Sequence, residues 1–278
     1  MLKQRLITAI ILIVLFLGAI FNVDTQGLGV LLAVLVAAGA WEWAGLMRLS
    51  SALLKSLYLL ATVFLLYFSF ELLANPSLLE NLLIVSALFW LCALLFLCYA
   101  NATQMNIKAW HISPVISGFI GVLLLLPTWL ALLYIHGSLQ QGEWFLLFLM
   151  VLIWGADSGA YFAGRAWGKN KLAVVVSPGK TWEGFAGAML IAVVLAIAAA
   201  AYWYSDLKPQ VMFVLLCLFT VIFSVVGDLF ESLFKRQAGV KDSSKLLPGH
   251  GGVLDRIDSL TAAAPIFTLG MILLGIQS

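Results

Sequence analysis

Acidic and basic side chains that could hold a metal ion and phosphate groups gather near the end of the sequence. Asp228 is followed at i+4 and i+7 by Ser232 and Lys235, so the three would share one face of a continuous helix. Asp255 and Asp258 are three residues apart and would also share a face. Carboxylate oxygens suit a hard divalent cation, and basic side chains suit phosphate oxygens. The spacing therefore predicts a metal and phosphate site.

The same stretch supplies further basic residues and a glycine-rich turn. Gly251 and Gly252, in "PGHGG", allow the backbone to approach a ligand closely. The basic residues interleaved with the acids are Lys235, Arg236, Lys241, Lys245 and Arg256. Simpler interpretations stay open: Asp255 as a helix cap, the glycines as a plain turn, the basic residues as a membrane flank, and His250 as a surface histidine.

A second polar segment precedes this one. Asp157 lies within a predicted span, where a carboxylate is costly unless it is paired, hydrated or bound to metal. "SPGKTWEG" resembles a P-loop, but Val174 stands where that motif requires glycine, so the motif fails. Lys180, Thr181 and Glu183 are still candidates for contact with a phosphate or a nucleotide. The alternative is a basic loop that leads into the next span.

Composition identifies the elements that must position these residues. Of 278 residues, 63% are hydrophobic and only 10% are charged, which excludes an ordinary soluble domain. The apolar blocks have the length of membrane-spanning helices, and runs such as "LLAVLVAAGA" lack the period-two alternation of a transmembrane barrel. We therefore expect an all-α, polytopic membrane helix bundle.

About nine spans are predicted, and they divide the chain into two regions. Residues 1–143 would hold about five spans, and residues 144–278 would hold four spans with the polar loops 163–183 and 234–258. The predicted spans are 6–23, 27–46, 53–73, 81–100, 112–135, 144–162, 184–204, 211–233 and 259–276.

The basic residues predict how these spans are oriented. With a cytoplasmic N-terminus and an outside C-terminus, fourteen of the 15 basic residues fall on the cytoplasmic side, and Lys208 alone lies outside. Both polar loops would then face the cytoplasm and its nucleotides and metal ions. Sixteen of the 28 charged residues lie within 154–183 and 228–258, so the polar chemistry gathers at one face. A transporter is the rival interpretation, and it would instead distribute polar residues along several spans.

The spaced residues resemble the signature of the phosphatidate cytidylyltransferase (CDP-diacylglycerol synthase) family. The matching elements are Ser232, Lys235–Arg236, Lys241–Asp242, His250–Gly251–Gly252, Asp255–Arg256 and Asp258. "WGADSGAYFAGRAWGKNKL" and "SPGKTWEG" resemble the other polar segments of that family, so the likeness is strong over about residues 150–262. The N-terminal half resembles the family only in its hydrophobic spans.

The resemblance implies a reaction of CTP with phosphatidic acid, assisted by Mg²⁺ and with the number of metal ions left open. Asp228, Asp255 and Asp258 would be metal ligands, Asp258 as ligand or nearby support. The implied phosphate contacts are Lys235, Arg236, Lys241 and Arg256. The implied substrate-binding residues are Asp157, Lys180, Thr181, Glu183, Ser232, Asp242, His250, Gly251 and Gly252.

The resemblance also implies a setting and a set of partners. The protein would be a multi-pass protein of a bacterial inner membrane, with its site facing the cytoplasm, and a homodimer is the expected assembly. No nucleic-acid partner is expected. The enzymatic alternatives are a CTP-dependent lipid kinase and a synthase of a related CDP-lipid. Glu42, inside the second span, is a weaker functional candidate that could instead pair within the bundle.

Overall fold

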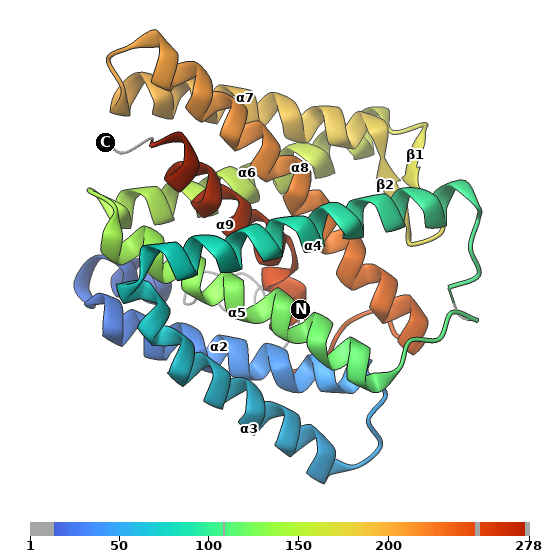
Figure 1. The fold of residues 1–278 in the computed structure, drawn as a ribbon. Coiled ribbons are helices and arrows are strands. Elements are labelled where there is room, and N and C mark those ends of the chain that lie inside the picture. Colours follow the sequence, from blue (N-terminus) through green and yellow to red (C-terminus); the bar gives the residue numbers. More distant parts are fainter. Residues whose placement is uncertain (1–13, 108, 248–250, 276–278) are drawn as a thin grey trace.

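Long apolar helices make up most of the chain (Figure 1). The computed structural model describes residues 14–107, 109–247 and 251–275. In this part, eight helices are long and apolar enough to cross a membrane: α2 (Thr25–Leu46), α3 (Ala52–Ser69, continued by the 3-10 helix η1, Phe70–Ala74), α4 (Pro76–Ala102), α5 (Pro114–Ser138), α6 (Gly142–Trp167), α7 (Trp182–Trp203), α8 (Leu207–Ala238) and α9 (Leu254–Leu274).

The predicted all-α polytopic bundle is confirmed. The second to ninth predicted spans each coincide with one of these helices. The first predicted span, 6–23, lies partly outside the described residues, and its described part is helical over 14–22.

Local sequence signals fix several helix ends. The side chain of Asn75 accepts a hydrogen bond from the Leu78 amide, and Pro76 occupies the first turn, where a missing N–H costs nothing. Ser113 and Pro114 begin α5 in the same way. At the other end of α8, Gly239 has φ 78°, a left-handed conformation that glycine adopts freely.

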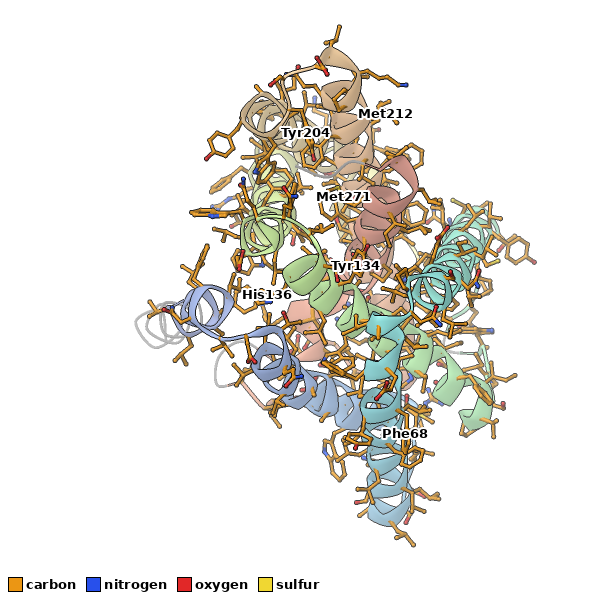
Figure 2. The ribbon with its side chains drawn as sticks, turned by 60° about the vertical axis from the view of Figure 1, so that its left-hand side comes forward. Phe68, Tyr134, His136, Tyr204, Met212 and Met271 are labelled. Carbon is orange, nitrogen blue, oxygen red and sulfur yellow. The ribbon has the colours of Figure 1, made fainter. Side chains whose placement is uncertain are left out.

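The polar connections lie at one end of the bundle, at the right in Figure 1. The α2–α3, α4–α5 and α6–α7 connections and the C-terminal end of α8 are all found there. The opposite end comes forward in Figure 2, where Tyr134, His136 and Tyr204 are labelled. There the two ring nitrogens of His136 lie 3.0 Å from Thr25 Oγ1 and 3.0 Å from the Ile20 carbonyl oxygen.

A small β-hairpin joins α6 to α7 at the polar end. Strands β1 (Lys171–Ala173) and β2 (Ser177–Thr181) are antiparallel, with Lys171 opposite Thr181 and Ala173 opposite Ser177. The sequence predicted a loop over 163–183; the structure instead has helix to Trp167, the hairpin, and helix again from Trp182. The end of α4 supports the hairpin, since Asn101 Oδ1 accepts from the Val174 amide at 2.9 Å.

A threonine links α5 to α9 where a proline interrupts the hydrogen bonds of α9. Pro265 has no N–H to donate to the carbonyl of Thr261, four residues earlier. The Thr128 hydroxyl lies 3.0 Å from that carbonyl oxygen and can donate to it. The same hydroxyl also lies 2.6 Å from the Leu124 carbonyl oxygen of its own helix, so its one hydrogen is shared between an acceptor of α5 and an acceptor of α9.

Candidate active site

Close packing of α8 on α9 brings the predicted acids together. A Cβ at Gly227 would lie 2.5 Å from the Asp258 carbonyl oxygen and 3.3 Å from the Ala262 Cβ, so only glycine permits this approach. Asp228 follows Gly227 directly, and its charge interacts with that of Asp258. Acids of α8 and α9 that were predicted to bind a metal ion therefore lie on adjacent, closely packed helices, and metal binding stays a prediction.

Asp228 forms an ion pair with Lys180 of β2. Lys180 Nζ lies 2.7 Å from Asp228 Oδ2, and the two side chains are 27% and 30% exposed. One turn further along α8, the Ser232 hydroxyl donates to Asp228 Oδ1 at 3.3 Å. The shared helix face predicted for Asp228 and Ser232 is therefore present, and the hairpin adds a cation to it.

A cavity of about 450 Å³ opens beside this ion pair, between α6, α7, α8 and the hairpin. Asp157, Lys180 and Asp228 line it, and their charges interact. Small residues on α6 and α7, including Ala160, Gly164 and Gly184, form much of its wall. The cavity thus presents two basic side chains, Lys180 and Arg165, and two carboxylates beside an apolar wall.

Lys235 is buried in a second ion-pair cluster at the end of α8. Its Nζ lies 2.8 Å from Asp255 Oδ1 and 3.1 Å from Glu231 Oε1. The three side chains are only 8%, 8% and 4% exposed. The predicted phosphate contact of Lys235 would require its ammonium group to leave these partners.

Asp255 accepts hydrogen bonds from the backbone that precedes α9. Its oxygens receive the Ser243 amide at 3.0 Å, the Ser243 hydroxyl at 3.0 Å and the Gly252 amide at 2.8 Å. Together with Lys235, these donors occupy both carboxylate oxygens. Gly251 has φ 86°, and a Cβ there would lie 2.9 Å from Asp255 Oδ2. Both glycines of the predicted turn therefore line the Asp255 carboxylate.

Asp258 lies one turn further along α9 and is half-buried. Its Oδ1 accepts from the Ser259 amide at 2.7 Å, and its carbonyl accepts from the Thr261 hydroxyl at 2.6 Å. The i, i+3 relation between Asp255 and Asp258 places both at the N-terminal end of α9, as the spacing predicted.

The carboxylates predicted to bind a metal ion lie near one another but are not grouped as a complete ligand set in the described residues. In the described ranges, no three residues among His, Cys, Asp and Glu are grouped closely enough to hold a metal ion. Yet both carboxylate oxygens of Glu231 are buried and accept no hydrogen bond from the described residues, although Lys235 lies beside them. Asp228 and Asp258 add carboxylates nearby, and carboxylate oxygens are what Mg²⁺ prefers.

Thr181 and Glu183 shape the start of α7. The Thr181 hydroxyl accepts from the Gly184 amide at 3.1 Å, which makes it the N-cap of the helix. Glu183 accepts from the Lys169 and Asn170 amides at 3.1 and 3.2 Å, so it holds the chain leaving α6. Thr181 lines the cavity, whereas Glu183 is not among the lining residues, and the predicted nucleotide contacts of both stay predictions.

The remaining predicted residues lie around the end of α8. Arg236 donates to the Val176 carbonyl at 3.4 Å and to the Val240 carbonyl at 3.1 Å, and so ties the hairpin to α8. Lys241, Asp242 and Arg256 are exposed, whereas His250 lies outside the described residues.

Two buried acids were not among the predicted site residues, although Glu42 was named as a weaker functional candidate. Glu231 pairs with Lys235 at i+4, a relation visible in the sequence. Glu42 of α2 is 2% exposed and contacts the start of α9. This contact joins residues more than 200 positions apart, so the sequence alone does not reveal it. The one sequence signal for Glu42 is a carboxylate in the middle of an apolar span.

Comparisons with known proteins cover nearly the whole chain. The sequence model described as "Cytidylyltransferase family" matches residues 3–274. The phosphatidate cytidylyltransferase of Haemophilus influenzae is 41% identical, with 96% of this chain and 98% of that protein aligned. The enzyme of that name from Pseudomonas aeruginosa is 40% identical, with 96% of each chain aligned. The one from Bacillus subtilis is 46% identical over 45% of this chain and 46% of its own length.

Proposed function

Because the chain belongs to the cytidylyltransferase family, we propose that it is a phosphatidate cytidylyltransferase of phospholipid biosynthesis. It would convert CTP and phosphatidic acid to CDP-diacylglycerol and pyrophosphate. The main evidence is that the chain is 40–41% identical to enzymes of this name over 96% of its length. The cavity supports the proposal, because it combines a cation and carboxylates with an apolar wall at one end of the helix bundle.

The reaction needs no strong general base. One oxygen of the lipid phosphate bonds to the α-phosphorus of CTP, while the bond from that phosphorus to the oxygen leading to the β-phosphate breaks. Its electron pair leaves with pyrophosphate. A phosphate monoester has a second pKa of about 6, so the attacking group is largely ionised at neutral pH. The obstacle is repulsion between two anions, and its remedy is neutralisation and in-line positioning.

Lys180, one of the two basic side chains that line the cavity, is placed to supply this neutralisation. Its ammonium group lies at the cavity and is held by Asp228 at 2.7 Å. An ammonium group can turn toward a phosphate oxygen while it keeps one carboxylate partner, because it has three donors. Lys235 is buried against two acids, so its first role is to balance their charge.

A Mg²⁺ ion would be held by carboxylates of α8 and α9. Asp228, Asp255 and Asp258 are the proposed ligands, whereas Glu231 already has the Lys235 ammonium group as its cation. When bound, the ion would neutralise charge on the triphosphate. Asp255 would have to release one of its present donors to bind the ion directly, because both its oxygens are occupied.

The proposed setting is a bacterial inner membrane, with the polar end of the bundle facing the cytoplasm. The distribution of lysine and arginine supports this orientation, since fourteen of 15 would lie on that side. The site could then receive CTP from the cytosol and a lipid headgroup from the membrane. A homodimer remains a prediction, which light scattering of the purified protein in detergent would test.

The test is an assay of the purified protein in detergent with CTP, Mg²⁺ and phosphatidic acid. We expect release of pyrophosphate and a lipid product heavier by one CMP unit, identified by mass spectrometry. Absence of both products across several acyl-chain lengths and Mg²⁺ concentrations would overturn the proposal.

The same assay separates the alternatives. A CTP-dependent kinase would release CDP and leave a phosphorylated lipid, and it would accept lipids that lack a phosphate. A synthase of another CDP-lipid would form its product from a different lipid phosphate. Flux of substrate into sealed vesicles without CTP would favour a transporter.

A further inference from the structure

A buried carboxylate of the N-terminal half contacts the start of the helix that carries Asp255 and Asp258. Glu42 Oε1 accepts from the Val253 amide at 2.9 Å, and Oε2 accepts from the Leu254 amide at 2.7 Å. The Ser244 hydroxyl donates to Oε1 at 2.5 Å, and the Ser243 hydroxyl lies 3.0 Å from Oε2. Three donors from one short stretch of chain therefore meet this side chain, and a fourth group, the Ser243 hydroxyl, is shared with Asp255.

Physical chemistry explains why an acid is stable there. The first amides of a helix have no acceptor within the helix, and the helix dipole makes this end favourable for a negative charge. Glu42 lies at that end of α9 and is 2% exposed, so water cannot replace the bonds it accepts. A buried carboxylate is costly without such donors. The Glu42 carboxylate and the first amides of α9 therefore stabilise each other.

Ser243 connects Glu42 to the Asp255 carboxylate. Its hydroxyl oxygen lies 3.0 Å from Glu42 Oε2 and 3.0 Å from Asp255 Oδ2. Its amide also donates to Asp255 Oδ2, at 3.0 Å. A shift of Glu42 would thus move a direct partner of Asp255 as well as the first turn of α9.

The close fit of Glu42 also explains one glycine of the predicted turn. A Cβ at Gly252 would lie 2.6 and 2.7 Å from the two Glu42 oxygens and would collide with the Ser243 hydroxyl. No positive φ is involved at this position. Gly252 is required because a carboxylate from another part of the chain occupies the space beside it.

We propose that Glu42 is a positioning residue of the reaction: it fixes the start of α9 and the Ser243–Ser244 segment, so that Asp255 and Asp258 keep their places opposite α8. The kinetic part of this proposal rests on the proposed function, whereas the structural role of Glu42 does not. It gives α2 a share in building the site, although no side chain of α2 lines the cavity among the described residues.

The kinetic test uses Glu42→Gln, which preserves size but replaces one acceptor oxygen by a donor facing an N–H group. We expect kcat to fall about 100-fold, as when reacting groups are misplaced by about 1 Å. The KM for CTP should change less than about three-fold, because no substrate contact is removed. The matched control is Glu71→Gln, the same change at an exposed acid of η1, with kcat expected to stay at the wild-type value.

Amide hydrogen exchange gives a readout that does not depend on activity. In Glu42→Gln, the peptide containing Val253 and Leu254 should exchange faster, while the hairpin peptide over 171–181 keeps its wild-type rate. Faster exchange throughout the protein would indicate general destabilisation and overturn the specific role. If the wild type makes no CDP-diacylglycerol, the proposed function fails, and the exchange result still decides whether Glu42 holds α9.

Two milder variants keep the inference testable if Glu42→Gln does not fold. Glu42→Asp retracts the carboxylate by one methylene, and Ser244→Ala removes the shortest hydrogen bond that Glu42 accepts. Each should lower kcat by about ten-fold with an unchanged melting temperature, since each removes part of one cooperative network. A wild-type kcat in both folded variants would overturn the proposal.

Discussion

Replacement of the buried Lys235 should destabilise the protein strongly. Lys235→Met keeps a long apolar stem but removes the ammonium group 2.8 Å from Asp255 and 3.1 Å from Glu231. Both acids are less than a tenth exposed, so they would be left as buried charges without a cation. Removal of one partner from a buried ion pair costs about 3 to 5 kcal/mol of unfolding free energy.

This energy translates into a measurable change in the melting temperature. At roughly 2 to 4 °C per kcal/mol for a chain of this order of size, the variant should melt about 6 to 20 °C below the wild type. Tryptophan fluorescence of the protein in detergent measures the transition. The matched control is Lys208→Met, at an exposed lysine with no ion pair in the described structure, and it should melt within about 1 °C of the wild type.

A second substitution tests whether uncompensated charge is the cause. Adding Glu231→Gln to Lys235→Met removes one of the two stranded acids and should recover part of the lost stability. If Lys235→Met melts within about 2 °C of the wild type, the ion pairs contribute no more than surface pairs do, and the reasoning from burial is wrong.

Three further substitutions should lower activity. Asp228→Asn should lower turnover at least about 100-fold in the CTP assay with a near-normal melting temperature, because it removes a carboxylate proposed to hold the metal ion; near-normal activity would remove Asp228 from the metal site. Lys180→Met breaks the partly exposed ion pair with Asp228, which contributes about 1 kcal/mol or less to stability. It should nevertheless slow pyrophosphate release about 100-fold, because a cation beside the negative charge of the transition state is lost. Equal rates in the variant and the wild type would contradict this role of Lys180. Gly252→Ala should lower kcat about ten-fold because its Cβ would displace the Glu42 carboxylate, whereas Gly45→Ala, with open space around the new Cβ, should match the wild type in the same assay.

The helices could be predicted because their signals are local. Apolar blocks of the required length gave the second to ninth spans, and the spacing of Asp228 and Ser232 on one face requires only that α8 continue, as it does to Ala238. The ends at Asn75 and Ser113 follow from a capping side chain and a proline in adjacent positions.

The hairpin and the buried pairs could not be predicted in the same way. Strands β1 and β2 have three and five residues, which is too short for a reliable alternation pattern, and β2 contains Pro178 and Gly179. The contact of Glu42 with Val253 joins residues 211 positions apart, so it depends on how α2 packs against α9. Single-sequence patterns carry no information on such a pairing.

The structure divides the charged residues of this region into a buried group and a partly exposed group. Lys235, Asp255 and Glu42 are buried, and their partners are each other, backbone amides and serines at the α8–α9 junction. Lys180 and Asp228 are partly exposed and line the cavity. The buried group holds the end of α8 and the start of α9 in place. These two helices carry Asp228 and its neighbour Asp258. Loss of a charge in the first group should therefore lower stability or misplace α9, whereas loss of a charge in the second should slow the reaction of an intact fold. The contrast between Lys235→Met and Lys180→Met is the direct measure of that division, because the two variants lose the same ammonium group from different surroundings.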